Sequence, residues 1–329
     1  MSSAVTNYPN GVSSFGVTLS GSIPNVFGST GQGNVYWVNS NTGSDGNDGL
    51  STDSAFATIE KAYALAVSGD TIALSTNSSH TLSAKLDVTK SRVNFIGVDF
   101  FGRFLQQGAK VQVTSGANAY VVKDTGVRNS FVNLKFIQSS TDATALTVFQ
   151  GGGEGTLFSG SSFTFGVVNN LDETTASEFV AGTDSATYQN CTFGADTLLT
   201  SAARTVFLID IVNTAEFKSN QLHNCMFSIS SSSSTATFVK LAATTDILFS
   251  NLFKECTFYA SVDSAGGAAL GIASFTGTGT TKGTIAYDRC SFFNVTDVAT
   301  ATSGGNAATQ IVAAVPTAGT AGIGVAPTA

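Results

Sequence analysis

The sequence predicts an all-β protein in which one structural unit repeats, namely a parallel β-helix with one capping helix near its start and an extended arm at each end. Two observations carry this prediction. A hexapeptide recurs about every thirty residues, and short apolar strands lie between its copies. The composition agrees, because only 11% of the 329 residues are charged whereas 34 are Gly and 25 are Phe, which indicates many turns around a large apolar interior.

The hexapeptide has an apolar first residue, Cys at position 4 and Phe at position 6. Four close copies begin at residues 188, 222, 253 and 287, and two weaker copies without Cys begin at residues 131 and 158. The steps between first residues are 27, 30, 34, 31 and 34, as expected for a repeated unit whose loops vary in length. A β-sandwich is the alternative fold, but it offers no reason for core residues to recur in step.

Positions 4 and 6 share one face of a strand and therefore predict two interior columns. We expect the sixth residues to stack as a column of Phe136, Phe163, Phe193, Phe227, Phe258 and Phe292. We expect the fourth residues to form a ladder of Cys191, Cys225, Cys256 and Cys290. Disulfides between stacked turns would be strained, so we predict buried free thiols. We predict no zinc site, because a linear ladder is not tetrahedral.

Position 1 is apolar but has the wrong parity to share a straight strand with positions 4 and 6, so a corner must lie between them. Residues that tolerate left-handed backbone occupy position 3 in four copies, namely Asn133, Gly160, Asn190 and Asn224. Glu255 and Arg289 break this pattern. A second apolar strand is expected in each turn, near residues 120–122, 145–149, 206–211, 237–241 and 272–275.

The N-terminal part divides into an uncharged arm, residues 1–34, and a cap of the β-helix, residues 35–73. The cap is expected to contain a strand at 34–39 and a helix over 54–66, whose apolar residues recur at helical spacing. Thr52, Asp53 or Ser54 would cap the helix, and Gly69 follows its end. The helix would cover the first turn, whose unpaired strand edge would otherwise promote aggregation.

The turn at residues 42–49 contains Asp45 and Asp48, the weak candidates for a Ca²⁺ site. The turn is too short for an EF-hand loop, which needs a carboxylate at its twelfth position. A solvated turn in which Asp side chains bind their own backbone is the favoured interpretation. The body of the β-helix is expected over residues 74–297, and residues 298–329 form an uncharged tail rich in Ala, Gly and Thr.

Residues 35–73 resemble the start of many right-handed parallel β-helix proteins of the pectate-lyase-like class. Such proteins open with a Tyr-x-Val strand, a Gly-Ser-Asp-Gly-x-x-Gly turn, a Phe-x-Thr-Ile-x-x-Ala helix and a Gly-Asp-x-Ile segment. The matching segments here are Tyr36–Val38, Gly43–Gly49, Phe56–Ala62 and Gly69–Ile72. With the hexapeptides, the resemblance covers about residues 35–297. It implies the right-handed β-helix fold and says little about activity.

The opening segments Asn7–Gly11 and Ser14–Gly16, followed by this block, resemble β-helix proteins encoded among tailed-bacteriophage virion genes. The resemblance implies a structural virion protein that decorates or cements the capsid, as a homotrimer bound to the major capsid protein or another virion protein. Its expected location is the virion surface after synthesis in the host cytoplasm, since we find no signal peptide. Two alternatives stay open: a tail spike or fibre that binds host surface glycan, with or without cleaving it, and a bacterial surface adhesin.

Catalytic candidates are few. A glycosidase needs two carboxylates about 5–10 Å apart across a groove. The acidic residues available are Asp210 in a strand, Glu178 and Asp184 in loops, and the adjacent pair Asp172 and Glu173. A lyase would need Lys or Arg beside acidic Ca²⁺ ligands, and we expect Lys240 and Arg204 to lack such partners. We interpret His223 as a corner residue. The Asn-x-Asp, Asp-Asp and Gly-His-Gly set of pectin hydrolases is missing, so we predict no enzyme activity and no cofactor.

The net charge of −7 makes nucleic acid and anionic membranes poor partners. No run of about 18 apolar residues is present, so we expect no membrane span.

Overall fold

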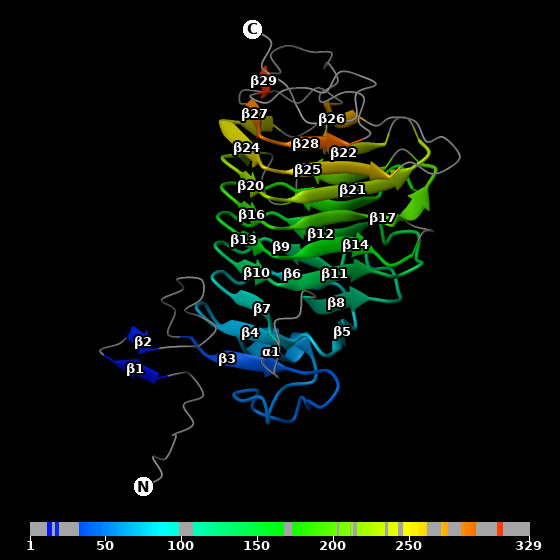
Figure 1. Ribbon diagram of the computed structural model, residues 1–329. Helices are drawn as coiled ribbons and strands as arrows, with labels where there is room; N and C mark the ends of the chain where they lie inside the picture. The colour runs from blue at the N-terminus through cyan, green and yellow to red at the C-terminus, as the bar shows by residue number, and fades with distance from the viewer. Residues whose placement is uncertain are drawn as a thin grey trace.

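The computed structural model describes residues 12–14, 17–19, 33–98, 108–167, 173–202, 204–210, 212, 216–233, 236–242, 246–261, 271–275, 284–293 and 308–311. Its turns stack one on another from β3 to β27, as Figure 1 shows. Three parallel sheets of ten, eight and seven strands run along the stack. The predicted all-β parallel β-helix is therefore confirmed.

The ten-strand sheet contains position 1 of every hexapeptide. Neighbouring strands are parallel, and Phe131 pairs in register with Phe158, which pairs with Tyr188. The strands, in chain order, are β3 (Val35–Val38), β4 (Thr71–Ser75), β7 (Asn94–Val98), β10 (Ser130–Val132), β13 (Leu157–Ser159), β16 (Thr187–Gln189), β20 (Gln221–His223), β24 (Ser250–Lys254), β27 (Thr284–Asp288) and β29 (Ala308–Ile311).

The eight-strand sheet begins where the hexapeptide ends, so position 6 lies in it. The six Phe residues pair in unbroken register from Phe136 to Phe292. Its strands are β5 (Ser79–Thr81), β8 (Ala109–Val113), β11 (Leu134–Gln138), β14 (Ser162–Phe165), β17 (Thr192–Thr200), β21 (Met226–Ser231), β25 (Thr257–Ser261) and β28 (Ser291–Phe293).

The seven-strand sheet holds the predicted second strands. Its members are β6 (Leu86–Val88), β9 (Val122–Asp124), β12 (Thr147–Gly151), β15 (Ser177–Ala181), β18 (Thr205–Ile209), β22 (Thr237–Leu241) and β26 (Gly271–Phe275). Two short pairings lie outside the three sheets: β19 (Glu216–Lys218) is parallel to β23 (Asp246–Leu248), and β1 (Val12–Ser14) is antiparallel to β2 (Val17–Leu19).

Residues with left-handed backbone conformation flank the short strands of the ten-strand sheet at both ends. After each strand, position 3 has a φ between 50° and 58° in all six copies, at Asn133, Gly160, Asn190, Asn224, Glu255 and Arg289. Before the strands, φ lies between 54° and 66° at Arg92, Arg128, Gly155, Ser185, Ser219 and Phe249. The predicted corner is thus present even where Glu and Arg replace Asn.

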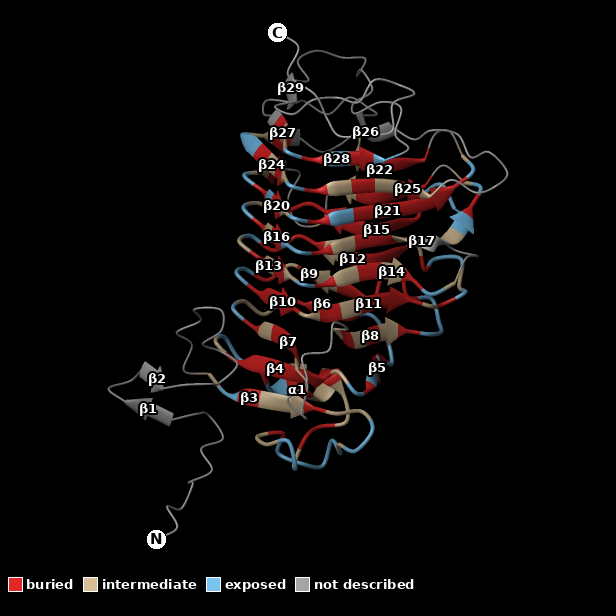
Figure 2. Ribbon diagram, in the orientation of Figure 1, coloured by how far each residue is buried: buried red, intermediate tan, exposed pale blue. Residues whose placement is uncertain are grey.

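The interior consists of aromatic columns, and Figure 2 shows buried residues along the stacked strands with exposed residues in the loops. Besides the hexapeptide Phe column, Phe149 stacks on Phe179 at 5.3 Å, and Phe179 stacks on Phe207 at 5.3 Å. Rings of different columns meet edge to face, as Phe163 and Phe179 do at 4.9 Å and 81°. Offset and edge-on contacts are the favoured geometries of aromatic rings.

The cap helix α1 (Ile59–Leu65) is shorter than predicted, and the expected start at residue 54 is wrong. Phe56 pairs as a β-bridge with Val38, and its amide donates to the Trp37 carbonyl at 2.8 Å. Because this extended segment continues to residue 58, the N-cap is Thr58, whose side chain accepts from the Lys61 amide. The helix packs on β3 and β4 through Ile59 and Ala62.

Within the described chain, no helix has the length and apolar character needed to cross a membrane. The predicted arms, residues 1–34 and 298–329, fall mostly outside the described residues. Of these segments, β1 and β2 pair with each other, and β29 pairs in parallel with β27 at the edge of the ten-strand sheet.

Candidate functional site

The structure places the six hexapeptide Phe rings in one interior column. Neighbouring ring centroids are 4.7 to 5.4 Å apart, with interplanar angles of 7° to 19°. Every ring is at most 9% exposed. These rings have no access to a ligand, so their role is to hold successive turns together.

The four Cys residues form a buried ladder of free thiols. Each thiol donates to main-chain carbonyls: the Cys225 Sγ lies 3.5 Å from the Tyr188 oxygen, and the Cys290 Sγ lies 3.3 Å from the Phe253 oxygen. Burial raises the pKa of Cys225, and the neighbouring Cys225 thiol raises the pKa of Cys256. A protonated, shielded thiol is a poor nucleophile and metal ligand, so the ladder is structural.

The carboxylates of Asp45 and Asp48 each accept hydrogen bonds from other residues of the N-terminal cap. Asp45 Oδ1 accepts from the amides of Ala57 and Thr58, both at 3.0 Å, and Asp45 Oδ2 accepts from the Thr58 hydroxyl at 2.7 Å. Asp48 Oδ1 accepts from the Leu50 amide at 3.0 Å and the Ser54 hydroxyl at 2.6 Å. The hydroxyl bond lowers the pKa of Asp48. These bonds fold the turn against the start of α1.

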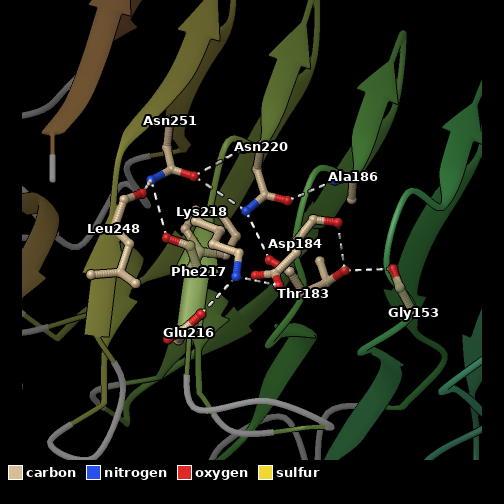
Figure 3. A network of polar contacts seen from close by, with 10 residues as sticks. All are labelled: Gly153, Thr183, Asp184, Ala186, Glu216, Phe217, Lys218, Asn220, Leu248 and Asn251. Carbon is tan, nitrogen blue, oxygen red and sulfur yellow. Dashed lines mark hydrogen bonds and ion pairs between the residues drawn. The ribbon is translucent and has the colours of Figure 1, made fainter. Parts of the chain in front are cut away.

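A ladder of Asn side chains, which sequence reasoning missed, lies two residues before the hexapeptides (Figure 3). The Asn220 Oδ1 accepts from the Ala186 amide at 2.9 Å, and the Asn251 Oδ1 accepts from the Asn220 amide at 3.0 Å. Asn129 plays the same part for the Val93 amide at 2.9 Å. Each Asn thus satisfies a buried main-chain donor of the preceding turn. Its recurrence at a fixed offset was the signal available in the sequence.

Lys218 joins two acidic residues at the edge of this network (Figure 3). Its Nζ lies 2.9 Å from Asp184 Oδ2 and 2.8 Å from Glu216 Oε2. Asp184 was a candidate carboxylate in the sequence, and it is instead part of an ion pair between successive turns. The arrangement stabilises the corner and offers no free base.

Asp124 is fully buried at the end of β9. Its Oδ1 accepts from Asn129 Nδ2 at 2.7 Å and from the Gly126 amide at 3.1 Å, and its Oδ2 accepts from the Thr156 hydroxyl at 3.0 Å. Burial nevertheless raises the pKa of Asp124 to about 7. The carboxyl group is a titratable part of the core and has no route to a substrate.

Glu178 and Arg204 correct two expectations. Glu178 lies in β15 rather than in a loop, and Arg204 does have a partner, because its Nη1 donates to Glu178 Oε1. Both residues are fully buried. In the other strands of the seven-strand sheet, the positions in register with Glu178 are occupied by apolar residues, namely Val148, Val206 and Phe238. Burial raises the pKa of Glu178, and Arg204 opposes that shift.

The other candidates do not converge. Asp210 follows β18, with its amide donating to the Ala181 carbonyl at 3.0 Å. His223 ends β20, just before a corner, and its Nε2 contacts Gln221 Oε1 at 3.1 Å. Asp172 lies outside the described residues, and Glu173 is exposed in the turn before β15. The side chains of the described residues include no group of three or more His, Cys, Asp or Glu able to hold a metal ion.

Phe249 is the most unusual surface residue. It is 66% exposed and has a φ of 54°. The left-handed φ is shared by the equivalent corner residues, among them Arg92, Arg128, Ser185 and Ser219, so it belongs to the fold. The exposed ring is the distinguishing feature of Phe249, since the two preceding turns have Ser at this corner.

The similarity of this chain to known proteins is structural. No protein-family model matches the chain, and a search of curated proteins finds no match. A pectin methylesterase in complex with a hexasaccharide is similar in structure, with 10% identity and a TM-score of 0.40, over 78% of this chain and 80% of that chain. The pectin methylesterase from Aspergillus niger shows 11% identity and a TM-score of 0.36, over 82% and 90% of the two chains.

Proposed function

We propose that this protein is a structural component of a tailed-bacteriophage particle, a decoration or cement protein whose β-helix is a rigid, non-catalytic shaft. The observation that carries this proposal is that three acidic residues are engaged in ion pairs and hydrogen bonds within the β-helix. Glu178 and Asp184, two candidates for sugar hydrolysis, are held by Arg204 and Lys218, and Asp124 is enclosed by hydrogen-bond donors. Carboxyl groups engaged in this way are occupied within the shaft and are not free to act on a sugar.

The ends of the shaft offer a means of attachment. The ten-strand sheet ends at β3 on one side, and on the other side β29 adds a parallel strand to β27. Main-chain pairing of this kind also joins separate chains. Since residues 1–34 and 298–329 carry no charge, contacts made by these arms would depend little on salt.

The surface supplies a second contact point. Phe249 is 66% exposed, and burial of its ring in a neighbouring protein would offset the cost of that exposure. The expected assembly is a symmetric homo-oligomer, a trimer on the capsid lattice.

Immunogold electron microscopy of the particles tests this proposal, with antibody raised against residues 33–293. Label distributed over the capsid is expected. In a matched sample in which the protein lacks residues 1–34, the capsids should carry no label. The truncated protein should remain folded and free in solution. Label confined to the tail tip would favour the tail-spike alternative, and label on uninfected cells would favour the adhesin alternative. Either result would overturn the decoration role.

A further inference from the structure

A polar pocket of about 440 Å³ lies on the outer face of the eight-strand sheet, near its N-terminal end. Its floor includes Ser79, Lys110 and Lys135, which are in register on β5, β8 and β11. Its walls include Asn41 and Thr76. Neighbouring strands are about 4.8 Å apart, so the two Lys side chains leave the sheet side by side.

The two Lys residues are an unfavourable pair in the free protein. Like charges directly opposite each other on neighbouring strands destabilise a sheet. Neither Lys110 nor Lys135 forms an ion pair with another residue of the described chain. The corners show the opposite arrangement, since Arg289 Nη2 lies 2.8 Å from Glu255 Oε1 of the preceding turn.

The other polar groups that line the pocket are uncharged. They include the side chains of Asn41, Asn77 and Ser79, of which Asn77 and Ser79 are exposed. An anionic ligand in this pocket would therefore neutralise the two ammonium groups together.

We propose that this pocket binds the phosphate group of a phosphorylated sugar or polyol. Two adjacent cations match the charge of a phosphate monoester, which is close to −2 at neutral pH. The pocket is much larger than a phosphate ion, and its amide- and hydroxyl-bearing walls at Asn41, Asn77 and Ser79 suit the hydroxyls of the attached polyol. A charged ligand held by Lys side chains should bind best at low ionic strength.

Isothermal titration calorimetry of the full chain with glucose 6-phosphate at low ionic strength tests the proposal, with glucose and inorganic phosphate as companion ligands. Binding of glucose 6-phosphate but not glucose is expected. Lys110→Gln and Lys135→Gln should each weaken binding at least about tenfold, since each removes a charged hydrogen bond. Lys123→Gln, which removes an equal charge from β9 in another sheet, should leave binding unchanged.

Comparison of glucose 6-phosphate with inorganic phosphate shows whether the site binds a phosphate ester or free phosphate. Tighter binding of glucose 6-phosphate than of inorganic phosphate supports the ester. Equal binding of the two would limit the site to free phosphate and overturn the assignment of a sugar or polyol. No heat with either anion, or equal binding by the Lys110→Gln/Lys135→Gln double variant, would overturn the site itself. Thermal unfolding gives an independent check, because the wild type should be stabilised by glucose 6-phosphate whereas the folded double variant should not.

Discussion

Two positions of the same hexapeptide follow different rules. Position 6 is Phe in all six copies and is buried in a column. Position 3 varies among Asn, Gly, Glu and Arg, yet its φ stays between 50° and 58°. The interior therefore specifies a side chain, because the rings must stack on like rings at about 5 Å. The corner specifies a backbone conformation.

Corner side chains also form contacts between neighbouring turns. The Asn224 Nδ2 donates to Asn190 Oδ1 at 2.7 Å, and Arg289 forms an ion pair with Glu255. The substitutions that break the Asn pattern thus come as a complementary pair. If interior and corner differ in this way, equivalent substitutions at the two places should have very different effects.

The largest effect is expected from Phe227→Ala. Its ring is fully buried between Phe193 and Phe258, so its removal should lower the free energy of unfolding by about 3–5 kcal/mol. The matched control is Phe249→Ala, whose ring is 66% exposed and should cost less than about 1 kcal/mol. Urea unfolding followed by circular dichroism measures both, and equal losses would contradict the contrast.

The buried ion pair gives the next test. Arg204→Met leaves Glu178 uncompensated in the core and should cost roughly 3–5 kcal/mol. Its surface counterpart, Arg289→Met, breaks an ion pair whose members are 61% and 49% exposed and should cost at most about 1 kcal/mol. Adding Glu178→Leu to Arg204→Met should restore most of the loss. A double variant as unstable as Arg204→Met would show that the pair is not the cause.

Asp124 predicts a pH dependence of stability. Burial raises its pKa to about 7, whereas the unfolded value is about 4. Between these values the folded protein holds a proton that the unfolded chain has lost, so stability should fall as the pH rises from about 4 to 7 and then level off. The decrease from this group amounts to at most about 4 kcal/mol.

Asp124→Asn is the matched variant, since an amide can accept from Asn129 and donate to Thr156. The difference in unfolding free energy between wild type and Asp124→Asn should therefore change with pH across this range. A difference independent of pH would mean that the carboxylate is stabilised by its three donors as well as it would be by water.

The smallest effect concerns backbone strain at the corner. Phe249→Gly removes a side chain from a left-handed residue, which should stabilise the protein by about 0.5–1 kcal/mol. Ser219→Gly, at the preceding corner, is the control and should show a similar gain. If Phe249 is a contact residue, its variant should also lose oligomeric state by analytical ultracentrifugation while the Ser219 variant keeps it.

Much of the fold could be predicted because the Phe and Cys columns are repeated in the sequence and depend only on strand parity. The helix start could not, because Phe56 obeys the helical spacing and yet pairs with Val38. The Glu178–Arg204 pair was missed because its members come from different turns, 26 residues apart. Contacts between turns become visible only when the lengths of the intervening loops are known.

The central claim is that successive turns stack in register with buried side-chain columns. Native alkylation of Cys191, Cys225, Cys256 and Cys290, followed by intact mass and peptide mapping, tests it across four turns at once. The account predicts four free thiols that react only as fast as the β-helix unfolds, with one common rate. Rapid labelling of the native protein, or a mass deficit that shows disulfides, would contradict it.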